Sequence, residues 1–152
     1  MKITEKQREK LLDAIPLIAA YVAFADGDLD KKEIESARNV AGLRRFASKV
    51  EPQVRKYYKD VFDQFDDKFL KLVHDLPVEE GARNEYLERE IAKMNPILQE
   101  LDPLHALQLL KSFRSFATHV ARAEGGFLSM GSFGPKEAEA MKLKMLNDID
   151  SL

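Results

Sequence analysis

The stretch Asp102–Gly125 reads DPLHALQLLKSFRSFATHVARAEG, and it decides the fold class of this chain. Asp102 followed by Pro103 is typical of a helix start, because aspartate caps a first turn and proline there lacks an N–H that would have no partner. Large apolar side chains then recur every three or four residues, which predicts one amphipathic helix ending at Gly125–Gly126. We expect this helix, the most apolar of the chain, to lie at the centre of a helical bundle.

The segments on either side show the same helical spacing, and none shows the alternation of a strand. Thr4 and Gln7 form a capping box that opens a first helix, which Pro16 either kinks or divides in two and Gly27 ends. Further helices are expected over 30–48, over 52–76 either continuous or broken at 66–67, over 77–94, and over 134–149. The sequence therefore predicts an all-α, compact single-domain bundle of about 6–8 helices spanning residues 1–152.

Composition excludes several classes of protein. A chain of 152 residues is the size of one average domain, and its formal charge of −2 lacks the basic excess of a nucleic-acid-binding protein. No cysteine is present, so thiolate metal sites and thiol catalysis are excluded. The first ten residues have no apolar core, and no apolar run is long enough to span a bilayer. We expect a soluble, cytoplasmic protein that does not insert into membranes.

A short motif occurs twice, as VAFADG at Val22–Gly27 and as VARAEG at Val120–Gly125. Each copy places small residues at an expected helix end, followed by an acidic residue and glycine. A glutamate follows each copy at the start of the next expected helix, Glu33 in the first case and Glu137 in the second. The pattern indicates a weak internal two-fold repeat, and if the two halves face one another their carboxylates converge.

The first copy continues into an acidic loop in which alternate positions carry carboxylates. Carboxylate oxygens are the ligands that Ca²⁺ and Mg²⁺ prefer, but the sixth and twelfth positions of this loop hold lysine and alanine, so it is not an EF-hand. A metal site here therefore needs ligands from elsewhere, and the second copy supplies them. The candidate ligands are Asp26, Asp28, Asp30, Glu33, Glu124 and Glu137. The alternative is that these carboxylates only cap helices and complete turns.

The two Ala-(Asp/Glu)-Gly turns, each followed by a helix-starting glutamate in an all-helical chain, resemble the TerB-like family, named for bacterial tellurite-resistance proteins. The likeness runs from about Ile15 to Ile149, with a close match at 25–33 and, at 123–137, a glutamate in place of aspartate and a longer loop. The resemblance implies a compact helical bundle, an acidic cluster that binds a divalent metal, and a role in bacterial stress response or in assembling partner proteins. It implies no catalytic activity, and it maps the same six carboxylates onto the metal site.

Two further features bear on function. Phe127, Leu128, Met130 and Phe133 follow the second motif on an expected loop, where they either tuck into the core or form a patch for a protein partner. The second hypothesis is therefore an adaptor that binds proteins without metal. His119 lies one turn before Glu124. It is either a metal ligand or a half-buried, hydrogen-bonded residue. A hydrolase using paired carboxylates ranks last, because no substrate-positioning groups are evident.

Overall fold

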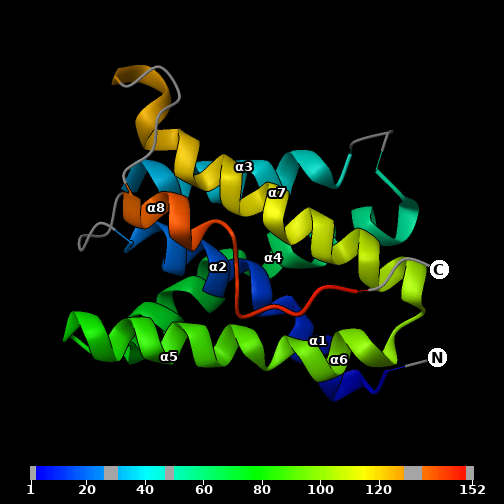
Figure 1. The fold of residues 1–152 in the computed structure, drawn as a ribbon. Helices are drawn as coiled ribbons and strands as arrows, with labels where there is room; N and C mark the ends of the chain where they lie inside the picture. The colour runs from blue at the N-terminus through cyan, green and yellow to red at the C-terminus, as the bar shows by residue number, and fades with distance from the viewer. Residues whose placement is uncertain (1–2, 26–30, 47–49, 129–134, 150–152) are drawn as a thin grey trace.

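The computed structural model describes residues 3–25, 31–46, 50–128 and 135–149, with side chains for all of these except 31–33, 123–128, 135 and 137. The described residues form eight helices and no strand, which confirms the predicted all-α fold (Figure 1). The helices are α1 (Glu5–Leu12), α2 (Ala14–Ala23), α3 (Lys31–Arg44), α4 (Pro52–Asp75), α5 (Glu80–Ala92), α6 (Met94–Glu100), α7 (Pro103–Leu128) and α8 (Pro135–Ala140).

Helix α2 is the most enclosed element of the bundle. In Figure 1, α5 and α6 run end to end along one side and α3 and α7 along the other, with α2 between them. It packs against α3, α4, α5 and α7, and nine of its ten residues are buried. Only Tyr21 is partly exposed. The expectation that α7 occupies the centre is therefore wrong, because α2 is apolar on every side whereas α7 has one apolar face.

Helix α7 shares the largest fully buried side chains of the core with α4: Phe113 and Phe116 come from α7, and Tyr58 and Phe65 come from α4. The buried face of α7 packs on α2 and α3 and includes Leu109, Leu110, Phe113, Phe116 and Val120. The predicted stripe begins too early, since Leu104 is 52% exposed at the first turn. Neither α7 nor any other described helix is both long and apolar enough to cross a membrane.

The first helical segment is divided in two. The predicted capping box is present: Gln7 N donates to Thr4 Oγ1 at 3.1 Å, and Thr4 N donates to Gln7 Oε1 at 2.8 Å. Helix α1 ends at Leu12, and Asp13 separates it from α2, in which Pro16 occupies the first turn. A proline is tolerated there because a first-turn residue has no intrahelical acceptor for its N–H.

The helices from α4 to α6 differ from the prediction in two places, at the start of α5 and at the division between α5 and α6. Helix α4 is continuous through Asp66–Asp67. Pro77 lies before α5, whose N-cap is Glu79, with its carboxylate accepting from the backbone of Gly81 and Ala82. These two hydrogen bonds lower the pKa of Glu79. The segment expected as one helix through Met94 is divided at Lys93, because Pro96 removes an N–H donor and crowds the preceding turn.

The C-terminal part departs furthest from the sequence analysis. Helix α7 continues through Gly125 and Gly126, so the second acidic motif lies within a helix, unlike Ala25, which follows the end of α2. Helix α8 is correspondingly short, ending at Ala140 rather than reaching Ile149. The following segment is not helical, and Leu143 has φ 48°.

The helical spacing of the sequence predicts that Ala138, Met141, Met145 and Ile149 face inward, but the deepest burial in this non-helical segment falls on other residues. Leu143 and Leu146 are buried, whereas Met141 and Met145 are only partly buried. Asn95 of α6 holds the segment in place: its Nδ2 donates to Met145 O at 2.9 Å and its Oδ1 accepts from Asn147 N at 2.9 Å. The helical period therefore missed the two most buried side chains, although Met141, Met145 and Ile149 also pack against the core.

Candidate functional site

The predicted metal ligands are distributed over four segments. Asp26, Asp28 and Asp30 lie outside the described residues. The backbones of Glu33, Glu124 and Glu137 belong to α3, α7 and α8, respectively, and their side chains are outside the description. Of the predicted partner-binding residues, Phe127 and Leu128 form the last turn of α7, and Met130 and Phe133 lie outside the described part of the chain.

The starts of two helices agree with the predicted motif. Helix α3 begins at Lys31, directly after Asp30, which makes Glu33 its third residue. Helix α8 begins at Pro135, directly after Gly134, which makes Glu137 its third residue as well. Both glutamates therefore sit in first turns, where the free N–H groups of a helix favour negative charge.

The fold brings the end of α2 and helix α8 together. The two helices pack against each other, as Figure 1 shows, and both line a hollow of about 270 Å³ together with α5. Ala25, which directly precedes Asp26, and Lys136 and Glu139, which flank Glu137, all line this hollow. The end of α2, which precedes Asp26 in the sequence, and α8, which carries Glu137, thus lie at the same end of the bundle.

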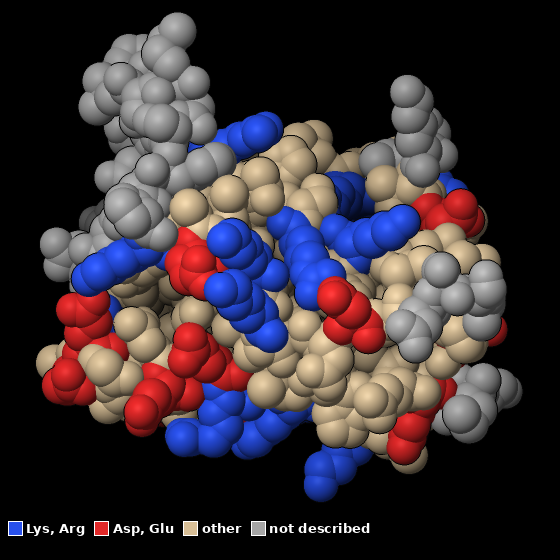
Figure 2. Space-filling view, in the orientation of Figure 1, with Lys and Arg blue, Asp and Glu red and all other residues tan. Residues whose placement is uncertain are grey.

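Carboxylates line this hollow, which we call the α2–α8 hollow. Tyr21 donates a hydrogen bond to Glu88 Oε2 at 2.8 Å, and burial, followed by this bond and the negative charges of Glu88 and Glu139, raises the pKa of the phenol. Glu80 pairs with Lys136 at 3.5 Å. Hydrogen bonds from lysines at 144 and 142 lower the pKa of Glu139. In Figure 2, acidic side chains gather over this end, around α5 and α8.

The described side chains do not by themselves form a metal site. Among them, no three Asp, Glu or His residues are grouped closely enough to hold an ion. The carboxylates of the α2–α8 hollow are already engaged by lysines or by Tyr21. A metal at this end would therefore need carboxylates other than the described ones.

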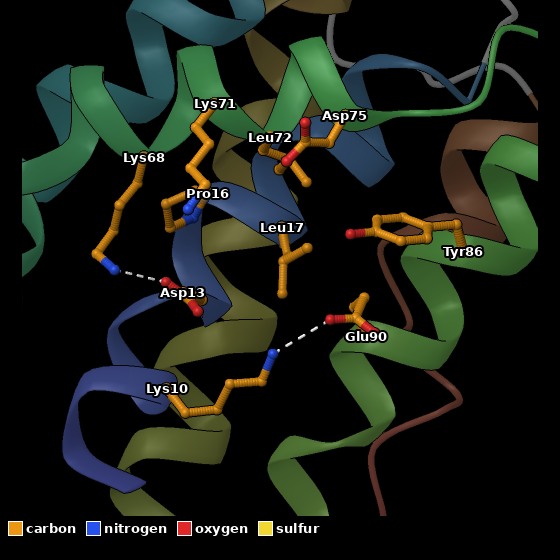
Figure 3. A pocket seen from close by; sticks show the side chains of 10 residues that line it. All are labelled: Lys10, Asp13, Pro16, Leu17, Lys68, Lys71, Leu72, Asp75, Tyr86 and Glu90. Atoms are coloured by element: carbon orange, nitrogen blue, oxygen red, sulfur yellow. Dashed lines mark hydrogen bonds and ion pairs between the residues drawn. The ribbon is translucent and has the colours of Figure 1, made fainter. Parts of the chain in front are cut away.

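A second hollow, of about 220 Å³, lies beside the junction of α1 and α2 (Figure 3). Four of its charged residues form two pairs around an apolar floor that includes Leu17: Lys10 contacts Glu90 at 3.2 Å and Lys68 contacts Asp13 at 2.6 Å. Burial alone would raise the pKa of Glu90, but hydrogen bonds from lysines at 93 and 10 outweigh it and lower the pKa. A carboxylate held ionised in this way is unsuited to donating a proton near neutral pH.

The sequence analysis missed two polar residues that the structure places in hollows. His105 lines a mainly apolar hollow of about 480 Å³, and its buried Nε2 has no hydrogen-bond partner among the residues that the structure describes. Burial lowers the pKa of this histidine, and Asp102 opposes that effect. Arg44 donates hydrogen bonds to α4 and α7. The signal for His105 was present in the sequence, since Leu101 and Leu109 lie one helical turn away on either side.

His119 is exposed rather than half-buried, although it is hydrogen-bonded. Its Nδ1 lies 2.9 Å from Ser115 O, one turn earlier in α7. The expectation of partial burial was wrong because His119 projects from the face of α7 opposite the core residues.

Comparison with known proteins adds no relative. No protein-family model matches the chain, and neither a curated protein nor a solved structure matches it. The fold and site therefore rest on the residues and the geometry described above.

Proposed function

We propose that this chain is a non-enzymatic, TerB-like helical domain that binds a divalent cation of the Ca²⁺ or Mg²⁺ type. The observation that carries the proposal is the α2–α8 hollow, because the end of α2, which precedes Asp26, meets there with α8, which carries Glu137. Asp26, Asp28 and Asp30 follow α2, and Glu33 and Glu137 occupy the first turns of α3 and α8.

Charge repulsion supports a cation at this end. Two carboxylates about 5 Å apart repel by roughly 3 kcal/mol at an effective dielectric constant of 20. The described lysines nearby are already committed, since Lys136 pairs with Glu80, and Lys142 and Lys144 pair with Glu139. A bound divalent cation would offset the repulsion among the remaining carboxylates, and oxygen ligands of this kind suit Ca²⁺ and Mg²⁺.

We propose no catalytic activity for this chain, because the TerB-like resemblance implies none and because of the properties of the described carboxyl groups. Four described carboxyl groups have a shifted pKa, and in all four the pKa is lowered: Glu5, Glu79, Glu90 and Glu139. A general acid needs a raised pKa, so these groups do not form an acid–base pair. The proposed cellular role, bacterial stress response of the tellurite-resistance type in the cytoplasm, rests on the TerB-like resemblance alone.

Calorimetric titration of chelator-treated protein with Ca²⁺, Mg²⁺, Mn²⁺ and Zn²⁺ tests the proposal. We expect saturable binding of about one ion per chain, weakened about ten-fold or more by Asp26→Asn and by Glu137→Gln. Glu35→Gln is the matched control, because Glu35 is an exposed carboxylate on α3 without a described partner. Ions at one hundred times the dissociation constant would also stabilise the fold by about 2.7 kcal/mol.

The second candidate is a protein-binding adaptor in which the acidic residues only cap helices. One observation favours it: the last turns of α7, which carry Phe127 and Leu128, project beyond α3 and α8 in Figure 1. Titrations without heat for any of the four ions, and without a rise in melting temperature, would reject the metal site and leave the adaptor. Equal weakening by Asp26→Asn and Glu35→Gln would reject the specific ligand set.

A further inference from the structure

A third hollow, of about 370 Å³, lies at the opposite end of α3 from the acidic residues. It is formed where the last turn of α3 meets the start of α4 and the middle of α7. Its lining combines the apolar side chain of Val54 with the cations Arg44 and Lys111 and the hydroxyls of Ser112 and Ser115. We call it the Arg44 pocket.

Arg44 is held by neutral groups. Its Nη1 donates to Tyr58 Oη and to Ser112 O, both at 2.9 Å, and its Nη2 donates to Ser115 Oγ at 2.9 Å. The guanidinium carbon also lies 5.1 Å from the centre of the Tyr58 ring and 5.9 Å from that of Phe116. No described carboxylate lies within ion-pairing distance of Arg44. Its positive charge is therefore held by hydrogen bonds and aromatic rings, without a carboxylate counterion among the described residues.

The contacts of His119 leave one N–H of Arg44 without an acceptor. His119 Nδ1 lies 2.9 Å from Ser115 O and 3.4 Å from Arg44 Nη2. A carbonyl oxygen can only accept, so Nδ1 carries the proton and donates it to Ser115 O. Nδ1 then has no lone pair to accept from Arg44. The second Nη2 proton, which faces His119 Nδ1, is therefore not taken up by a described acceptor.

The other charges lining the pocket add to this imbalance. Lys111 is exposed and has no ion-pair partner among the described residues. Glu51 is the one carboxylate in the lining; it does not cap α4 through its side chain. Two cations against one carboxylate leave a net positive pocket. In Figure 2, basic side chains likewise form a band over α7 and the segment after α8.

We propose that the Arg44 pocket binds a small phosphate monoester with a short apolar substituent. Phosphate monoesters carry about −1.5 to −2 charges at pH 7, which matches Arg44 and Lys111 together better than a monocarboxylate does. Arg44 contributes its guanidinium charge, Ser115 can donate its hydroxyl proton, and Lys111 supplies a mobile ammonium. Val54 provides the surface for the apolar substituent.

Titration of ¹⁵N-labelled protein with propyl phosphate, followed by ¹H–¹⁵N correlation spectra at low ionic strength and pH 7.5, tests this site. We expect saturation with a dissociation constant on the order of 1 mM, and shifts at the amides of Ser112 and Ser115. Butyrate, which has the same apolar chain on a single carboxylate, should bind about five-fold more weakly. Inorganic phosphate, which lacks the chain, should bind about three-fold more weakly.

Three variants separate a binding role from a structural one. Lys111→Gln should weaken propyl phosphate about three-fold without changing the fold, because Lys111 is exposed and unpaired. Lys6→Gln removes the same charge from an exposed position on α1 and should leave affinity unchanged. Arg44→Lys should abolish saturable binding, because lysine lacks the planar guanidinium group of arginine. If Arg44→Lys does not fold, the Lys111→Gln measurement still tests the site.

Several outcomes overturn the proposal. The proposed site would be contradicted if binding did not saturate by about 20 mM propyl phosphate, or if the wild type and Lys111→Gln bound propyl phosphate with equal affinity. Equal weakening by Lys6→Gln would show that only net charge matters. Butyrate binding as tightly as propyl phosphate would exclude phosphate selectivity. Binding to phosphatidic acid vesicles without binding of propyl phosphate would identify a membrane headgroup in place of a soluble ligand.

Discussion

Replacing Gly42 of α3 with alanine should destabilise the protein, although alanine is the better helix former. A Cβ at Gly42 would lie 2.7 Å from Cε1 and 3.0 Å from Cδ1 of Phe62 on α4. The guanidinium of Arg45 covers the same ring at 4.1 Å from its centre, which hinders the ring from moving away. Alanine gains about 1 kcal/mol over glycine in a helix interior, and overpacking costs about 1–3 kcal/mol. The net loss of unfolding free energy should be about 1 kcal/mol.

Removing the ring should reverse the sign. In a Phe62→Ala background, Gly42→Ala should stabilise the fold by about 1 kcal/mol, because only the propensity gain remains. Urea unfolding followed by far-ultraviolet circular dichroism gives both values, and their difference is a coupling free energy of about 2 kcal/mol. Asn39→Ala, at an exposed position of α3, is the control and should have the same effect in both backgrounds. A coupling below about 0.5 kcal/mol would refute the close packing of α3 on Phe62.

Three further predictions concern the C-terminal segment and one half-buried carboxylate. Leu146→Ala should lower the free energy of unfolding by about 2–4 kcal/mol and Met145→Ala by about 1 kcal/mol, as measured by urea unfolding. A larger loss for Met145→Ala than for Leu146→Ala would instead support the helix that the sequence predicts here. Asn95→Ala should cost about 1–2 kcal/mol and speed hydrogen exchange at the Asn147 amide, and unchanged exchange would contradict that contact. Glu90→Gln should cost about 1–2 kcal/mol at pH 7. Because the folded pKa of Glu90 is lowered, this cost should shrink as pH falls below 4.5 and vanish below the folded pKa; a pH-independent cost would contradict the ion pairs.

Helix starts were the most predictable feature of this chain. The capping box of Thr4, the first-turn position of Pro16 and the Asp102–Pro103 start were all confirmed. Each depends on groups within one turn of the residue concerned, so the local sequence contains the necessary information. Helix ends were less predictable: the glycines at 125 and 126 were expected to stop α7, but α7 continues through them. A single glycine lowers helix stability by only about 1 kcal/mol, which surrounding structure can override.

The candidate sites differ in how far the sequence could predict them. The six carboxylates of the proposed metal site were identified from a repeated motif, and their convergence stays a prediction. The Arg44 pocket had no signal in the sequence, because Arg44, Tyr58 and Ser112 come from three different helices and Ser112 lies 68 residues from Arg44. The division of α5 from α6 had a signal, Pro96, that was not used.

The sequence by itself determined the all-α class and most helix starts, because apolar period, caps and prolines act within a few residues. Only the tertiary structure decided that α2, not α7, is the enclosed helix, and that α8 packs against the end of α2. It also decided that Leu143 and Leu146 enter the core. These outcomes depend on which surfaces are buried together, and burial is a property of segments brought together from distant parts of the chain.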